Sequence, residues 1–273
     1  MFSSLLTTKL FTPRPPPNLV ARPRLTQQLA DGLLRGHRLI LVVAPAGYGK
    51  TTLVTNWLGK AGMPSAWLAL DEDDNDPVRF FTYVVAALQT LDPTVGQSLP
   101  DTFRSAPQSL EAFISPLIND LAAADRLLIL VLDDYHVISN TLIQEALGFL
   151  LDHSPPNFHL VVLTRADPPF PLSRLRVREA LTEIRDRDLR FAPEEMAAFL
   201  NAVHHLNLPA EQIMALESRT EGWAAGVQLA ALSLQGRDAE QAAQFIQTFS
   251  GSHHYIIDYL ADEVLSAANL RTS

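Results

Sequence analysis

Cysteine is absent from this chain of 273 residues, which excludes disulfide frameworks, thiolate zinc sites and cysteine nucleophiles. Positive charge is also scarce, because 21 Lys and Arg residues face 30 Asp and Glu residues for a formal net charge of −9. This balance repels a polyphosphate backbone and disfavours general nucleic-acid binding, leaving open only a local site. No apolar run approaches the roughly 18 residues of a membrane-spanning helix, and residues 1–9 lack the pattern of a secretory signal. We therefore expect a cytoplasmic protein that has no membrane partner.

Apolar residues, at 47% of the chain against 19% charged, are abundant enough to build a large core. They gather in runs at residues 39–44, 127–132 and 158–163, with a shorter run at 66–70. Runs of this kind are typical of strands that are buried on both faces of a parallel sheet. The short segment 181–184, Leu-Thr-Glu-Ile, could add a fifth strand. Helical patterns lie between the runs, so the sequence predicts an α/β fold with a parallel sheet of about five strands.

The pattern changes after residue 190, where no further buried-strand run occurs. Helical patterns follow one another there, at residues 193–201, 222–234, 238–249 and 255–267. We therefore expect a domain boundary near residue 190 and an all-helical unit beyond it. At the other end of the chain, residues 11–17 hold four prolines, which lack N–H donors, and are predicted to form an extended arm.

Residues 44–52 have the sequence Ala-Pro-Ala-Gly-Tyr-Gly-Lys-Thr-Thr and lie between a predicted buried strand and a helical pattern. This layout is typical of a phosphate loop, in which backbone N–H groups and a helix N-terminus surround phosphates. Lys50 would reach the β- and γ-phosphates of ATP, and the Thr51 hydroxyl would ligate Mg²⁺. Ala44 stands where the motif has its first glycine. The alternative, a glycine turn that caps an ordinary helix, is disfavoured by the flanking strand and helix. We predict that ATP or ADP binds to the following residues: Pro45, Ala46, Gly47, Tyr48, Gly49, Lys50, Thr51 and Thr52.

Polar residues also follow two other predicted strands, at the sheet edge where parallel sheets bind ligands. Asp133 would hold Mg²⁺, and Asp134 would orient or deprotonate the attacking water. The alternative is that the two acids end the strand as solvated turn residues. Arg165 would share the charge of the transition state, or it would simply pair with a local acid such as Asp167. We predict Asp134, Lys50 and Arg165 as catalytic residues, and Thr51 and Asp133 as metal ligands.

Several further segments accompany these motifs, and together they resemble the nucleotide-binding part of MalT-type LuxR-family transcriptional activators. These regulators belong to the STAND class of signal-transducing P-loop ATPases. The resemblance extends over roughly residues 9–265. It rests on residues 8–10, 13–14, 19–25, 44–53, 67–77, 132–136, 175–178, 220–229 and 258–265.

The resemblance implies a P-loop NTPase core, a helical lid and the start of a winged-helix segment. The implied boundaries are an arm at 1–22 that contributes to the nucleotide site, a core at 23–190, a lid at 191–251 and a winged-helix start at 252–273. It also implies that Val20 and Arg22 lie beside the adenine and that Arg165 is a sensor. Inducer and ATP would convert a closed ADP-bound monomer into an open form that self-associates. Full-length members continue into a sensor and a helix-turn-helix, so we expect a truncated chain whose inducer and DNA contacts are made by absent segments.

The resulting hypothesis is an ATP/ADP-binding molecular switch with weak Mg²⁺-dependent ATP hydrolysis. Two alternatives stay open: a stand-alone AAA-like ATPase, and an ADP-holding interaction module with negligible turnover.

Three other features of the sequence are interpreted as structural. The acidic run 71–76 is predicted to be a solvated loop in which Asp76 and Pro77 begin a helix. For Trp223, packing inside the lid is favoured over direct contact with the nucleotide. For most of the arginines between 174 and 190, surface ion pairs are favoured over contact with phosphate or another subunit.

Overall fold

The computed structural model describes residues 5–17, 19–99 and 110–249, and the side chains of residues 110–113 lie outside that description. The chain divides into two compact units. The first unit comprises the described residues of Met1–Arg14, Arg24–Val43 and Thr51–Ile184. The second comprises those of Pro15–Pro23, Ala44–Lys50 and Arg185–Ser273. The expected helix at 255–267 and the winged-helix start at 252–273 lie outside the described residues.

The first unit is built on a five-stranded sheet with the strand order β2-β3-β4-β1-β5. Parallel pairing joins β1 to β4, β3 to β4 and β2 to β3, so the carboxyl ends of these strands meet at one edge. The predicted α/β fold with a parallel sheet is confirmed. The strands are β1 (Leu39–Val43), β2 (Ala66–Ala69), β3 (Leu128–Asp133), β4 (Phe158–Thr164) and β5 (Leu181–Arg185).

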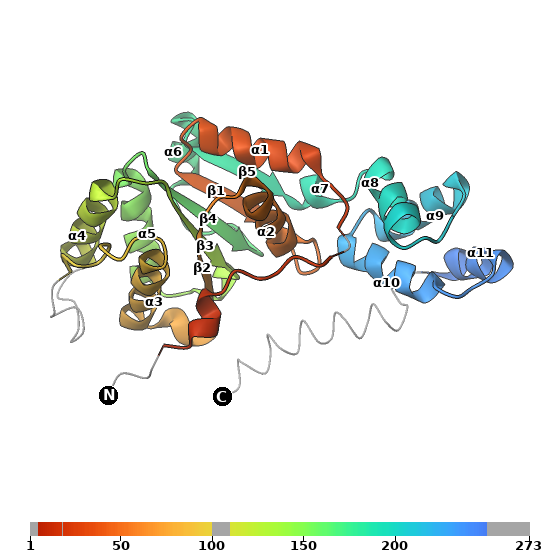
Figure 1. The fold of residues 1–273 in the computed structure, drawn as a ribbon, viewed down its shortest axis with the longest axis horizontal. Coiled ribbons are helices and arrows are strands. Elements are labelled where there is room, and N and C mark those ends of the chain that lie inside the picture. Colours follow the sequence, from red (N-terminus) through yellow and green to blue (C-terminus); the bar gives the residue numbers. More distant parts are fainter. Residues whose placement is uncertain (1–4, 18, 100–109, 250–273) are drawn as a thin grey trace. The chain divides into compact units, whose positions relative to one another are not determined.

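Helices cover the sheet because its strands are apolar on both faces. One face packs alternate strand residues, such as Leu41, Leu130 and Leu160, into a core with α3, α4 and α5. Helix α1 lies along β5, where the Gln28 side chain donates a hydrogen bond of 2.9 Å to the Glu183 carbonyl oxygen (Figure 1). The helices of this unit are α1 (Pro23–Leu34), α2 (Lys50–Ala61), α3 (Pro77–Gln89), α4 (Leu110–Ala123), α5 (Thr141–His153) and α6 (Leu172–Val177).

The second unit is helical from Asp186 onward in its described part. Its core includes Leu200, Leu216, Ala230 and Ile246, which are almost fully buried. Helix α9 was not among the predicted helices, because its buried residues are only Ile213, Leu216 and Thr220. The elements are α7 (Asp186–Leu189), α8 (Pro193–Ala197), the π-helical turn Ala198–Val203, α9 (Ala210–Thr220), α10 (Ala224–Leu234) and α11 (Ala239–Thr248).

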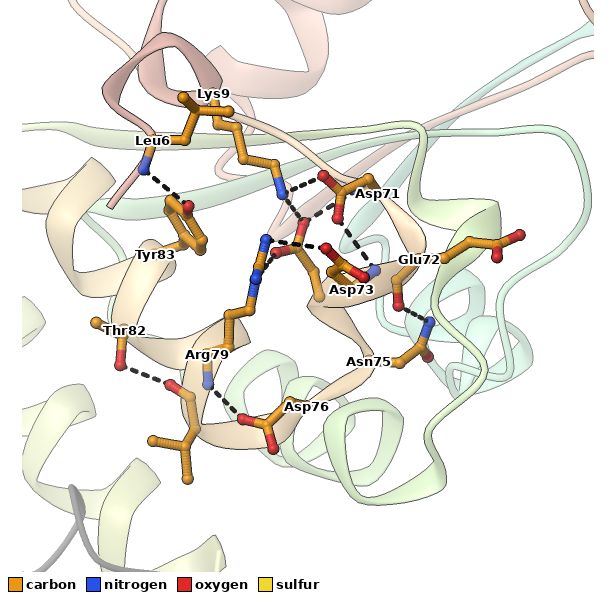
Figure 2. Close-up of polar contacts among 12 residues, drawn as sticks. Leu6, Lys9, Asp71, Glu72, Asp73, Asn75, Asp76, Arg79, Thr82 and Tyr83 are labelled. Carbon is orange, nitrogen blue, oxygen red and sulfur yellow. Dashed lines mark hydrogen bonds and ion pairs between the residues drawn. The ribbon is translucent and has the colours of Figure 1, made fainter. Parts of the chain in front are cut away.

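An ion-pair cluster in the first unit joins the 3₁₀ turn Thr7–Leu10 to the segment after β2 (Figure 2). The Lys9 ammonium lies 2.5 Å from Asp74 Oδ2 and 2.7 Å from Asp71 Oδ2. Arg79 Nε approaches the other oxygen of the Asp74 carboxylate at 3.2 Å. The Asp74 side chain is fully buried, so two cations compensate the loss of its hydration.

This cluster corrects one expectation from the sequence. The acidic run was predicted to be a solvated loop, and that prediction is wrong for Asp74. Its partner Lys9 lies 65 positions earlier in the chain, and no local pattern reveals such a contact. The predicted helix start is confirmed, because the Asp76 side chain accepts a hydrogen bond of 2.8 Å from the Arg79 backbone N–H.

Candidate nucleotide-binding site

The loop Ala44–Lys50 follows β1 directly and ends at the first residue of α2. Gly47 and Gly49 have positive φ angles of 76° and 79°, a backbone conformation that favours glycine. Turns of this kind bring successive N–H groups together into a concavity that attracts anions. The two glycines of the motif therefore occupy positions that require them.

Lys50 is buried, with 7% of its surface exposed. Its Nζ donates hydrogen bonds of 2.9 Å to the Ala44 carbonyl oxygen and 3.1 Å to the Pro45 carbonyl oxygen. The side chain therefore folds back over its own loop. The Lys50 Nζ therefore lies within the loop that the sequence predicts to bind phosphates.

Thr51 and Asp133 lie in contact in the first unit. The Thr51 hydroxyl donates to Asp133 at 3.0 Å from Oδ2 and 3.2 Å from Oδ1. Asp133 is the last residue of β3 and is 6% exposed. A hydroxyl and a carboxylate are oxygen ligands that suit Mg²⁺, which usually takes only one or two protein ligands together with phosphates and water. Within the described ranges, no group of three or more His, Cys, Asp or Glu residues is placed to hold a metal.

The remaining predicted catalytic residues lie just beyond the strand ends. Asp134 has a left-handed backbone, with φ 57° and ψ 36°, and its side chain is 52% exposed. Thr164 ends β4 in register with Val43 of β1 and donates a hydrogen bond of 2.9 Å to the Ala166 carbonyl oxygen. Arg165 follows Thr164 and is half-buried. The catalytic roles of Asp134 and Arg165 stay predictions.

Val20 and Arg22, expected beside the adenine, belong to the second unit. Val20 packs against the helical core of that unit. The Arg22 guanidinium is 3.0 Å from the Glu195 carboxylate, donates at 2.7 Å to the Arg190 carbonyl oxygen and lies over the Phe191 ring. These contacts tie the arm to the start of the helical segment. A role of either residue in adenine binding stays a prediction.

Trp223 makes a contact with the phosphate loop that sequence reasoning missed. It packs against the helical core, as expected, and its Nε1 also donates a hydrogen bond of 3.1 Å to the Ala46 carbonyl oxygen. Next to it, the Ala225 N–H donates to the Gly47 carbonyl oxygen at 2.9 Å. A signal was present in the sequence, because Trp223 stands among small residues, with Gly222 before it and Gly226 after it.

The arginines between 174 and 190 lie mostly in ion pairs, as predicted. Arg176 makes two hydrogen bonds of 2.7 Å with the predicted partner Glu183. Arg174 and Arg178 pair with Asp152, which sequence reasoning did not single out.

In the part of the chain that the structure describes, no helix is both long enough and apolar enough to cross a membrane.

The fold is that of the P-loop ATPases. A Walker-type ATPase of Pyrococcus abyssi matches it with a TM-score of 0.56 over 95% of this chain and 79% of that chain, at 14% sequence identity. The sheet and the phosphate loop between β1 and α2 are the parts that define this class. No family model matches the sequence.

The sequence is homologous to MalT-type transcriptional regulators over nearly its whole length. It is 39% identical over 267 residues to the HTH-type transcriptional regulator MalT of Serratia proteamaculans, covering 96% of this chain and 29% of that protein. It is 37% identical over 255 residues to the serine/threonine-protein kinase PknK of Mycobacterium tuberculosis, covering 92% of this chain and 23% of that protein. The chain thus spans less than a third of the length of these relatives.

Proposed function

We propose that this chain is an ATP/ADP-binding switch module of a MalT-like transcriptional regulator, with slow Mg²⁺-dependent hydrolysis of ATP. The observation that carries the proposal is the phosphate loop after β1, in which Lys50 lies on the loop carbonyl groups. The contact of Thr51 with Asp133 supports it, because both oxygen groups suit Mg²⁺. Similarity to MalT supports a regulatory role.

In this proposal each residue has a separate task. The N–H groups of residues 45–52 and the Lys50 ammonium bind the phosphates, while Thr51 and Asp133 hold Mg²⁺. Mg²⁺, when bound, supplies positive charge that neutralises phosphate oxygens. Asp134 orients the attacking water and accepts a proton from it, and Arg165 lies near the developing charge. Val20 and Arg22 lie beside the adenine.

We further propose the domain assignment that the resemblance implies, with an arm, a core at 23–190, a lid at 191–251 and a winged-helix start at 252–273. Self-association in the ATP state belongs to the same proposal. Contacts with an inducer or with DNA are not assigned to this chain. A module of a transcriptional regulator works where the DNA is, so we place the chain in the cytoplasm.

The first test is to identify and count the nucleotide that co-purifies with the chain, and then to measure ADP affinity by calorimetry. Lys50→Ala should weaken ADP binding at least tenfold, because a charge-assisted contact contributes about 1.5–3 kcal/mol. An unchanged affinity would contradict the phosphate-loop assignment. Stoichiometric ADP with negligible ATP turnover would favour the ADP-holding interaction module. Fast steady turnover would favour the stand-alone ATPase.

A further inference from the structure

Two N–H groups at the start of α10 donate hydrogen bonds to carbonyl oxygens of the phosphate loop. The donors and the acceptors all belong to the second unit. Trp223 Nε1 donates to the Ala46 oxygen at 3.1 Å, and the Ala225 N–H donates to the Gly47 oxygen at 2.9 Å. The two bonds act on consecutive peptide groups of the loop. One is a side-chain bond, so a substitution can remove it without changing the backbone.

Peptide planarity gives these bonds a consequence for phosphate binding. In a trans peptide the carbonyl group and the following N–H group point in opposite directions. The bond to the Ala46 oxygen therefore fixes the direction of the Gly47 N–H, and the bond to the Gly47 oxygen fixes that of the Tyr48 N–H. Backbone N–H groups of a phosphate loop are the donors that surround the phosphates.

The residues around this contact leave no space for larger neighbours. A Cβ atom on Gly47 would lie 2.7 Å from Ala225 Cβ and 2.8 Å from Trp223 Nε1. A Cβ atom on Gly226 would lie 2.7 Å from Trp223 Cε3. Gly47 therefore permits the close approach of the loop to α10, and Gly226 permits the position of the indole ring.

We propose that Trp223 is a positioning residue for phosphate binding. Its indole N–H, together with the Ala225 N–H, orients the loop donors before a nucleotide arrives. The affinity for phosphate then depends on the position of α10, because the groups at the start of this helix orient the loop donors. This inference rests on the proposed function, because it places a nucleotide at this loop.

The test compares ADP with adenosine, which has the base and ribose but no phosphate. The binding of both ligands is measured for the full chain and for Trp223→Phe, by calorimetry for ADP and by ligand-observed NMR for adenosine. Loss of one hydrogen bond should weaken ADP binding about five- to tenfold. The affinity for adenosine should change less than about twofold, because the affected donors face phosphate.

The matched control is Trp67→Phe, because Trp67 is 1% exposed and its Nε1 has no hydrogen-bond partner among the described residues. This variant should bind ADP as the unchanged chain does. A second variant, Gly226→Ala, displaces the Trp223 ring while Ala favours the helix, and it should weaken ADP binding in the same direction. Thermal unfolding shows that each variant is folded at the temperature of the titration.

Three results would overturn the inference. ADP affinity that is unchanged in both Trp223→Phe and Gly226→Ala would do so, and so would an equal loss of ADP and adenosine binding, which indicates a structural role for the ring. In either case a tenfold loss in Lys50→Ala leaves the proposed function intact. Full ADP binding by Lys50→Ala would overturn the proposed function together with the inference.

Discussion

Thr51 Oγ1 and Asp133 Oδ2 lie 3.0 Å apart, although the two residues are 82 positions apart in the sequence. Thr51 belongs to the first turn of α2, and Asp133 ends β3. The contact places a hydroxyl and a carboxylate together at the carboxyl edge of the sheet. Oxygen ligands in this arrangement suit Mg²⁺ that is shared with nucleotide phosphates.

Asp133→Asn should remove most of the gain in ATP affinity that Mg²⁺ gives. An amide in place of the carboxylate takes away the negative charge that attracts the ion. The measurement is ATP affinity with Mg²⁺ and with a chelator, for the unchanged chain and the variant. If Mg²⁺ strengthens ATP binding equally in both, Asp133 is not the metal ligand.

Asp134→Asn should slow ATP hydrolysis about a hundredfold or more and change ATP affinity less than about threefold. The two effects differ because a general base acts in the chemical step and not in binding. The side chain is 52% exposed, so this substitution should cost little stability. Single-turnover hydrolysis and equilibrium binding are measured on the same preparation. Parallel losses of rate and affinity would remove Asp134 from the role of base.

Acid should destabilise the first unit through His159, which is 3% exposed and bonds through Nδ1 to the His37 carbonyl oxygen at 2.7 Å. Burial lowers the pKa of His159 below its ordinary value of 6.5, despite the opposing effect of that hydrogen bond. The unfolded chain therefore binds a proton more readily than the folded chain. The free energy of unfolding should be highest above pH 6.5 and fall as the pH drops below that value.

Urea unfolding at a series of pH values measures this effect. Burial also lowers the pKa of His37, so both histidines contribute in the same direction. His159→Asn keeps a neutral N–H donor and does not titrate, so it should lose less stability in acid than the unchanged chain. Equal losses in the two proteins would show that His159 is not a source of the acid sensitivity.

Tyr135→Phe should leave stability unchanged or raise it by up to about 1 kcal/mol, because a buried hydroxyl without a partner costs desolvation free energy. Tyr135 is 2% exposed, and its hydroxyl has no hydrogen-bond partner within the described part of the chain. Denaturant unfolding measures the difference. A loss larger than about 1 kcal/mol would mean that the hydroxyl does make a stabilising bond.

Lys9→Met should destabilise the first unit by about 2–4 kcal/mol, because it removes one of the two cations that pair with the buried Asp74 carboxylate and leaves it with Arg79 and the Asp71 backbone N–H. Asp73→Asn is the matched control, since Asp73 is 77% exposed and lies 3.6 Å from Arg79. That control should change stability by less than about 0.5 kcal/mol. Equal, small effects of both substitutions in denaturant unfolding would contradict a stabilising role of the buried pair.

Much of the fold follows from local sequence patterns. Four of the five strands were predicted because each lies in a largely apolar run, and burial on both faces of a parallel sheet requires such runs. The fifth, β5, was predicted from a shorter segment that includes Thr182 and Glu183, and its residues alternate between buried and partly exposed positions. The start of α3 at Pro77 was predicted because an N-cap and a proline act within a few residues. Helix α9 was not predicted, since its few buried residues give a weak periodic pattern.

The sequence by itself determined the parallel sheet, the glycine-containing loop after β1 and the acidic end of β3, because each depends on residues that are neighbours in the chain. Only the tertiary structure decided which distant groups meet. Thr51 meets Asp133, Lys9 meets the buried Asp74, and the Trp223 indole meets the Ala46 carbonyl group. These contacts join residues that are 65 to 177 positions apart in the chain. Strand order and helix packing bring such residues together, and local periodicity specifies neither of them.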